Sequence, residues 1–352
     1  MKIRQWEMTA VGAPLRLAER DVSAIGPGEA LVRVAGTGLC HTDLGFLYDS
    51  VKTRHPLPLV LGHEIAGTVE DASPELRALI GDGVVVPAVM PCETCDSCRR
   101  GHGAICPKQI FPGNDIHGGF ASHVVVPARA LCRVPRDPAI GLAALSVLAD
   151  AIATPFSAIE RSGLGPEQVA IFVGVGGVGA FGVQIAAARH ALVVAIDIDA
   201  ERLQLAARHG ATLTFDARAM DAKAIKKAVR EAARSAAKRE TEWRIFETSG
   251  TVAGQETAFG LLVHGAYLSV VGYTHRPASL PLSHLMAFDA IAQGNWGCLP
   301  ALYPRALDLV LGGKIAIAPF IEEHPLSNIN EVLSLAREGK LKRRAVLVPD
   351  FA

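Results

Sequence analysis

Short runs of alternating apolar and polar residues fill the first third of the chain. Gly and Pro separate runs such as LVRVAG, GVVVPAV and ASHVVVP. This pattern is typical of strands joined by turns, and it indicates an antiparallel β region. We therefore expect residues 1 to about 135 to form a β-rich module.

The pattern changes from about residue 150. An apolar strand is expected at Val169–Val173, followed by a glycine turn, an Ala-rich helix at Val178–His190 and a second strand at Leu192–Ile196. This βαβ order predicts a parallel sheet. Residues 217–244 follow a helical pattern, and IFETSG, YLSVVGY and the segment near Trp296 predict further strands. The second part of the chain is therefore expected to be an α/β domain.

The C-terminal tail from Leu299 adds a third segment. It predicts helices at Tyr303–Leu311 and Asn328–Glu338 and a final strand, AVLVP. With 352 residues and 50% hydrophobic content, the chain is large enough to fill two separate cores. The sequence therefore predicts a globular protein of two domains.

Charge and cysteine content exclude several classes of function. Lys plus Arg equals Asp plus Glu at 35 each, so no net basic field attracts nucleic acid or an anionic membrane. The stretch MKIRQWEMTAVGAP has no signal-peptide core, and no apolar run approaches the roughly 20 residues of a membrane span. Four of the seven cysteines lie within Cys92–Cys106, which favours a metal site in a reducing compartment. A cytoplasmic location is expected.

A glycine-rich turn follows the strand VAIFV. The glycines at 174, 176 and 179 form the pattern G-x-G-x-x-G at the start of a helix. Gly174 permits the tight turn, Gly176 allows close approach of a pyrophosphate, and Gly179 lets the helix pack on the strand. The free N–H groups of the helix N-terminus favour phosphate. A purely structural turn is the alternative. The predicted cofactor-binding residues of the turn are Gly174, Gly176, Gly177, Val178 and Gly179.

An acidic residue ends the next strand. Asp197 stands 18 residues after Gly179, where a carboxylate accepts the adenosine ribose hydroxyls and repels a 2′-phosphate. NAD is therefore favoured over NADP. Arg202 lies close in sequence and tempers this choice, because a nearby arginine accommodates a 2′-phosphate.

Four cysteines form the pattern C-x2-C-x2-C-x7-C. This spacing suits one tetrahedral Zn²⁺ held by four thiolates with no open position, which is a structural site. An iron–sulfur cluster and unrelated reduced thiols are the alternatives. The predicted ligands are Cys92, Cys95, Cys98 and Cys106.

Two other segments carry metal-binding residue types without closing a site. They are Cys40-His41-Thr42-Asp43 and Gly62-His63-Glu64-x-x-Gly67. With the cysteine lobe and the glycine turn, in this order, they make the chain resemble the zinc-dependent medium-chain alcohol dehydrogenase family over nearly its whole length. The resemblance implies a GroES-like catalytic domain (residues 1–149 and 300–352, with the zinc lobe at 92–106) beside a doubly wound Rossmann domain (150–299).

The resemblance also implies a catalytic zinc with three protein ligands and a fourth position for substrate. Cys40 and His63 match two of the ligands, and Glu64 matches a possible exchanging ligand. Asp43 matches an acid that orients the ring of His63. Many relatives have a second cysteine as third ligand, but SVLADAIATPFSAI has none, and Asp150 stands where some relatives have an aspartate. An acidic helix cap is the alternative role of Asp150.

Further roles follow from the same resemblance. Thr42 matches the hydroxyl that receives the alcohol proton, with a local backbone contact as the alternative. His41 and Arg344 match residues at the cofactor pyrophosphate, and Thr154 matches a residue near the nicotinamide. Gly45 stands where many relatives have a histidine of the proton relay. The nearby candidates for that relay are Tyr48, Asp49 and His55.

The substrate is predicted less directly. GLCHTDLGFLYDSVKTRHPLPLVLGHEIAG and GHGAICPKQIFPGNDIHGGFASHVVVP look like segments of the 6-hydroxycyclohex-1-ene-1-carbonyl-CoA dehydrogenases, which oxidise a cyclic allylic alcohol thioester with NAD. This implies a surface for coenzyme A phosphates, with Lys226, Lys52 and Arg54 as candidates. A general secondary-alcohol or polyol dehydrogenase is the alternative, and a homodimer or tetramer is usual in the family. A zinc-free reductase and a zinc-knuckle nucleic-acid binder fit the motifs and charge less well.

Overall fold

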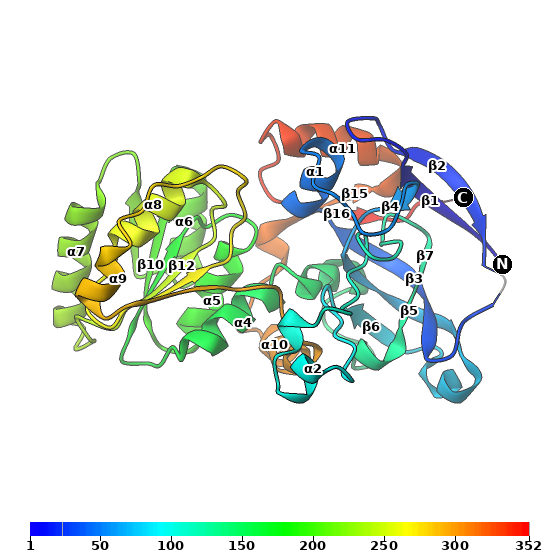
Figure 1. Cartoon of the computed structure of the whole chain (residues 1–352), viewed down its shortest axis with the longest axis horizontal. Helices are drawn as coiled ribbons and strands as arrows, with labels where there is room; N and C mark the ends of the chain where they lie inside the picture. Colours follow the sequence, from blue (N-terminus) through cyan, green and yellow to red (C-terminus); the bar gives the residue numbers. More distant parts are fainter. Residues whose placement is uncertain (23, 352) are drawn as a thin grey trace. The chain divides into compact units, whose positions relative to one another are not determined.

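The computed structural model describes residues 1–22 and 24–351, and the chain divides into two compact units (Figure 1). The first unit is made from both ends of the chain. It comprises Met1–Ala153, Gly297–Leu311 and Ile317–Ala352. The second unit comprises Thr154–Trp296 and Gly312–Ala316.

The first unit is built on a seven-stranded sheet in the order β15-β16-β3-β5-β6-β8, with β7 also paired to β3. Its neighbouring strands are antiparallel, as the alternating runs predict, except that β15 and β16 are parallel. The strands are β3 (Glu29–Gly38), β5 (Glu64–Ala72), β6 (Gly83–Val86), β7 (His123–Pro127), β8 (Cys132–Val134), β15 (Ile321–Pro325) and β16 (Arg344–Val348). A second sheet holds β2 (Arg16–Asp21), β1 (Lys2–Met8) and β4 (Leu59–Val60).

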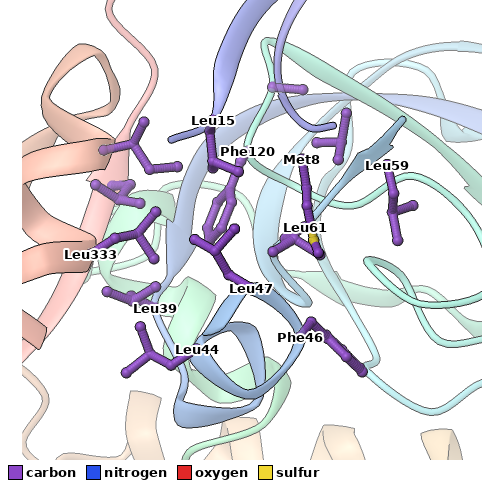
Figure 2. Packing of buried hydrophobic residues seen from close by; sticks show 14 of the residues in the cluster. Met8, Leu15, Leu39, Leu44, Phe46, Leu47, Leu59, Leu61, Phe120 and Leu333 are labelled. Carbon is purple, nitrogen blue, oxygen red and sulfur yellow. The ribbon is translucent and has the colours of Figure 1, made fainter. Parts of the chain in front are cut away.

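Helices of the first unit are short, and two of them close its core. In Figure 2, Leu44 of α1 (His41–Tyr48) and Leu333 of α11 (Ile329–Arg337) belong to one buried cluster with Phe120. The cluster anchors α1, and with it the Cys40–Asp43 segment. The other helices are α2 (Asp96–Arg99), α3 (Leu142–Leu145), α10 (Tyr303–Leu311) and the 3₁₀ turns η1 (Pro74–Leu79), η2 (Gly103–Ile105), η3 (Ala128–Ala130), η4 (Ser146–Ala149), η5 (Pro300–Leu302), η6 (Ala318–Phe320) and η7 (Leu326–Asn328).

The second unit is a six-stranded, wholly parallel sheet in the order β11-β10-β9-β12-β13-β14, with helices on both faces (Figure 1). The predicted α/β class is confirmed. Its strands are β9 (Val169–Val173), β10 (Leu192–Asp197), β11 (Leu213–Asp216), β12 (Arg244–Glu247), β13 (Tyr267–Val270) and β14 (Ile291–Gly294). Its helices are α4 (Ala153–Ser162), α5 (Gly179–Ala188), α6 (Ala200–Arg208), α7 (Ala222–Ser235), α8 (Val252–Gly260) and α9 (Ser283–Phe288).

Strand β9 shows why both faces of this sheet are covered. Ile171 packs in a buried cluster with Val229 of α7, whereas Phe172 points to the opposite face and lies under Gly182 of α5, where a Cβ would come within 2.3 Å of the ring. Successive side chains of a strand point to opposite faces, so an unbroken apolar strand requires helices on both sides.

One predicted helix is too long. The helical pattern of residues 217–244 forms a helix only over Ala222–Ser235, because Asp221 caps its start by accepting a hydrogen bond from the N–H of Ala224 (2.7 Å). From Arg244 the chain enters β12.

No single helix among the described residues is long and apolar enough to cross a bilayer. Two helical segments joined by a bend, Leu142–Ala149 and Ala153–Ser162, are together long and apolar enough. Most of their residues are buried within the chain itself.

Candidate active site

Asp43 joins the two segments that carry the predicted zinc ligands. Its Oδ2 accepts a hydrogen bond from the N–H of Cys40 (3.0 Å), and its Oδ1 accepts one from the N–H of Gly62 (3.0 Å). Gly62 has φ +91°, and a Cβ there would lie 2.7 Å from the ring of Phe120, so this position requires glycine. The same Oδ1 lies 3.4 Å from Nδ1 of His63. Asp43 thereby fixes Cys40 and the His63 ring in one arrangement.

His63 lies at the centre of the site and is 1% exposed. Its Nε2 is 3.6 Å from Oδ2 of Asp150, and the same carboxylate oxygen is 3.8 Å from Sγ of Cys40. Burial lowers the pKa of His63, but the carboxylates of Asp43 and Asp150 outweigh burial and raise that pKa well above its usual value. The surroundings of the ring therefore favour a positive charge.

A zinc ion fits this donor set. One ligand atom each from Cys40, His63, Glu64 and Asp150 lies within 4.8 Å of the others. Ligand atoms around tetrahedral zinc are roughly 3.3–3.8 Å apart, given bonds of about 2.0–2.3 Å. The two separations to Asp150 have this size. In the described part of the chain neither ring nitrogen of His63 has a hydrogen-bond partner, and a buried nitrogen without one is costly unless it binds a metal.

Glu64 forms a buried ion pair with Arg344. The two carboxylate oxygens accept hydrogen bonds from Nε (2.8 Å) and Nη2 of Arg344. A Cβ at Gly38 would collide with the Glu64 side chain, so β3 leaves room for the pair. Burial raises the pKa of the Glu64 carboxyl, and Arg344 opposes that rise. In an exchanging-ligand role, an oxygen of Glu64 would either share its lone pairs between Arg344 and the metal or leave Arg344.

Asp150 follows a segment that a buried tyrosine holds in place. The hydroxyl of Tyr303, from α10, donates to the carbonyl oxygen of Ala149 and accepts from the N–H of Ala88 (3.2 Å). Tyr303 is fully buried. The sequence predicted only that it begins a helix, and no local pattern indicates this contact, since the partners lie 154 and 215 residues away.

The predicted proton-transfer residues lie on and after α1. Oγ1 of Thr42 is 3.7 Å from Sγ of Cys40, so its hydroxyl is beside the metal ligands, whereas His41 is exposed. Among the relay candidates, Tyr48 lies beneath the guanidinium of Arg337 (4.4 Å from its carbon to the ring centroid). Asp49 is the C-cap residue that follows α1, and Nδ1 of His55 lies 2.6 Å from the carbonyl oxygen of Pro56.

The four-cysteine lobe brings its sulfur atoms together as the spacing predicts. Sγ of Cys95 is 3.5 Å from that of Cys98 and 3.7 Å from that of Cys106, which is 3.5 Å from that of Cys92. Four thiolates around one zinc would be about 3.8 Å apart. The Thr94 hydroxyl donates to Cys92 and lowers the pKa of that thiol to about 5, which favours the thiolate.

The glycine turn lies between β9 and α5. Gly174 has φ +89°, and a Cβ there would lie 2.6 Å from the main-chain nitrogen of Ser249. A Cβ at Gly179 would lie 1.9 Å from the carbonyl oxygen of Gly174. These two positions therefore require glycine for packing. A Cβ at Gly176 would meet only Arg202, at 3.4 Å, so this position has room for a ligand to approach. Gly177 and Val178 complete the turn.

Asp197 links the turn to the end of β10. Its Oδ2 accepts a hydrogen bond from the N–H of Val175 (2.7 Å), and its Oδ1 accepts from Ile198 (2.8 Å) and Asp199 (3.0 Å). A ribose hydroxyl would share Oδ2 with Val175, because a carboxylate oxygen accepts two hydrogen bonds. Arg202 faces Asp199 at 3.8 Å, and Thr154 is buried in α4.

Comparison with known proteins agrees with both halves of the chain. The sequence matches the alcohol dehydrogenase GroES-like domain over residues 26–136 and the zinc-binding dehydrogenase domain over residues 177–312. An alcohol dehydrogenase of Rhizobium meliloti (strain 1021) is 30% identical over 338 residues, 96% of each chain.

Solved structures show the same fold. The alcohol dehydrogenase of Aeropyrum pernix superposes with a TM-score of 0.86 at 30% identity, and galactitol-1-phosphate dehydrogenase of Escherichia coli superposes with 0.88 at 26% identity. Each comparison covers 98% of this chain and 100% of the other. The chain belongs to the zinc-binding medium-chain alcohol dehydrogenase family. It is an oxidoreductase with a GroES-like domain and a Rossmann-type domain.

Proposed function

We propose that this enzyme oxidises a secondary alcohol to a ketone with NAD and a catalytic zinc ion. The observation that carries the proposal is the approach of Cys40 and Asp150 to the buried ring of His63. Among the described residues, Nε2 of that ring lacks a hydrogen-bond partner. The three side chains would hold a zinc ion, whose chemistry when bound is that of a Lewis acid toward the alcohol oxygen.

The other residues of the first unit would prepare this chemistry. Thr42, next to Cys40, would take the alcohol proton on its hydroxyl oxygen while its own hydroxyl proton passes on toward solvent. Asp43 would keep Nδ1 of His63 oriented so that Nε2 stays available to the metal. The cysteine lobe would hold a second, structural zinc with no open position. The proposal therefore requires two zinc ions per chain.

Substitution of Asp150 tests the catalytic site. Asp150→Asn keeps the size of the side chain but weakens a charged zinc ligand, so we expect the metal content to fall from two zinc ions per chain to one, with loss of alcohol oxidation. Asp71→Asn, at an exposed aspartate, is the matched control and should keep both ions. Full activity and two ions in Asp150→Asn would refute the ligand assignment.

NAD would bind at the glycine turn of the second unit. Support comes from the room above Gly176, the position of the turn at the N-terminus of α5 and the acceptor capacity left on Asp197. We expect a higher kcat/KM with NAD than with NADP, and a smaller preference in Asp197→Ser. A wild-type preference for NADP would indicate that Arg202 outweighs Asp197.

The finer substrate proposal is a cyclic allylic alcohol carried as a coenzyme A thioester. Its support is the likeness of two sequence segments, and the structure adds none. Two of the candidate residues for the coenzyme A phosphates already contact other side chains. Arg54 pairs with Asp115 at 3.2 Å, and Lys226 lies 5.2 Å above the ring of Phe288. The alternative is a secondary alcohol or polyol, for which galactitol-1-phosphate dehydrogenase is a precedent among similar proteins. Comparing kcat/KM for the cyclic hydroxyacyl-CoA, free cyclohexenol and a polyol decides, since equal values for the first two would exclude the thioester.

We also propose that the enzyme is a homo-oligomer. Strand β14 is the edge of its sheet, and all four of its residues are exposed. Ile291 is 59% exposed, and an open edge strand can pair with the same strand of a second copy. Light scattering should show a dimer or tetramer in wild type and smaller species in Ile291→Lys. A wild-type monomer would refute the proposal.

A further inference from the structure

The carboxyl ends of three neighbouring strands of the second unit meet beside the glycine turn. Strands β9, β12 and β13 are adjacent and parallel. The chain leaves β9 toward β10, its neighbour on one side in the sheet, whereas β12 is its neighbour on the other side. This is the point in an open α/β sheet where connections reverse direction, and ligands bind outside the strand ends there. The last residue of β12 is Glu247.

Glu247 is fully buried, yet one of its carboxylate oxygens holds a complete turn. Oε1 accepts hydrogen bonds from the N–H of Ser249 (2.9 Å), the hydroxyl of Ser249 (2.6 Å) and the N–H of Gly250 (3.1 Å). Oε2 has no hydrogen-bond partner in the described ranges. A buried carboxylate opposes folding unless donors surround it, and an apolar side chain would avoid that cost. What the carboxylate supplies instead is a fixed position for the main chain after β12.

That main chain is in direct contact with the glycine turn. The N–H of Thr248 donates to the carbonyl oxygen of Val173 (2.9 Å), and its hydroxyl donates to that of Gly174 (2.6 Å). A Cβ at Gly174 would lie within 2.7 Å of three atoms of Ser249. Movement of Ser249 would therefore displace Gly174, because no space separates them.

The same turn is locked against the end of β13. A Cβ at Gly272 would lie 2.3 Å from the main-chain nitrogen of Gly250 and 2.9 Å from Oε2 of Glu247. The N–H of Gly272 donates to the main-chain oxygen of Glu247 (2.9 Å). Glu247 thus lies where the ends of β9, β12 and β13 contact one another.

We propose that Glu247 is a positioning residue for the nicotinamide cofactor: its carboxylate fixes the turn of residues 248–250, which fixes Gly174 at the start of the dinucleotide-binding turn. This rests on the proposed function of that turn. Glu247 itself is not expected to touch the reacting atoms. The segment IFETSG that contains Glu247 predicts a strand and no further role.

The test compares cofactor affinity with stability in the zinc-loaded enzyme. Glu247→Leu removes the acceptor of three hydrogen bonds, so we expect the Kd for NADH, measured by fluorescence titration, to rise at least about tenfold, the factor that corresponds to one lost charge-assisted hydrogen bond. Glu247→Gln keeps an acceptor oxygen and should recover most of the affinity. Glu256→Gln, at an exposed residue of α8, is the matched control. Zinc content and KM for the alcohol at saturating cofactor should not change.

The outcomes separate the two proposals. If Glu247→Leu lowers Tm but binds NADH as tightly as wild type, Glu247 is only structural and the inference is overturned. If wild type does not bind NADH, or Gly174→Val binds it equally well, the proposed cofactor site itself is wrong. Ser249→Ala removes one of the three donors to Oε1 and the acceptor of the Thr251 N–H, so it provides a milder variant should Glu247→Leu fail to fold. In that case a folded Ser249→Ala should still bind NADH more weakly than wild type, and an unchanged Kd in Ser249→Ala would overturn the inference.

Discussion

Replacing Tyr303 by Phe should weaken both the first unit and its zinc site. The substitution removes one fully buried hydroxyl and leaves the ring in place, so no large cavity forms. The N–H of Ala88 and the carbonyl oxygen of Ala149 lose a partner. A buried polar group left without its hydrogen bond costs about 1–3 kcal/mol. Since the Ala88 N–H keeps a long contact to Ala149 (3.4 Å), we expect a loss of about 2 kcal/mol in the free energy of unfolding.

The second effect concerns Asp150, which directly follows Ala149. Loosening an outer contact of a metal ligand typically costs about 10–100-fold in metal affinity. We expect the lower end, about tenfold, because Asp150 itself is intact. Urea unfolding at saturating zinc measures the stability, and competition with a chromogenic chelator measures the affinity of the weaker site. Tyr267→Phe, at a partly exposed tyrosine of the second unit, is the control. Lost stability with unchanged zinc affinity would show that Tyr303 does not position Asp150, and an unchanged stability would refute the hydrogen-bond argument.

Three further changes test other parts of the molecule. Cys98→Ser should lose the structural zinc and lower Tm, whereas Cys132→Ser, at a buried cysteine outside the lobe, should keep both ions in metal analysis. Phe120→Ala empties a fully buried site and should cost about 3–5 kcal/mol in urea unfolding; a loss below about 1 kcal/mol would contradict the packing. Burial, Arg20 and His55 lower the pKa of His117 to about 4, so folding favours its neutral form. The contribution of neutral His117 to the free energy of unfolding is complete above the unfolded pKa of about 6.5 and is lost as pH falls toward 4. His117→Gln should therefore flatten that part of the stability profile, and an unchanged slope would refute the assignment.

Local patterns predicted the parts of the fold and site that depend on near neighbours. The helix Tyr303–Leu311 begins and ends where the sequence places it, and the four cysteines meet because only 14 residues separate the first from the last. The ion pair of Glu64 with Arg344 spans 280 residues, and no local pattern distinguishes these two from any other charged side chains. No local pattern indicates the parallel pairing of β15 with β16 either. The predicted helix at 217–244 is too long because the Ala- and Lys/Arg-rich composition continues past the end of α7 at Ser235, up to the first residue of β12.

The three proposed zinc ligands come from three distant segments, and two buried contacts hold these segments. The carboxylate of Asp43 contacts both Cys40 and His63, and the hydroxyl of Tyr303 holds Ala149, the residue before Asp150. All these contacts are buried or nearly so, which leaves the ligand set little freedom to adapt to one alcohol or another. We therefore expect the substrate preference of this enzyme to depend on residues that line the path of the alcohol rather than on the ligands. It follows that substrate preference and zinc affinity, measured in the same variants, should vary independently of each other. The exceptions are substitutions that disturb the contacts of Asp43 or Tyr303.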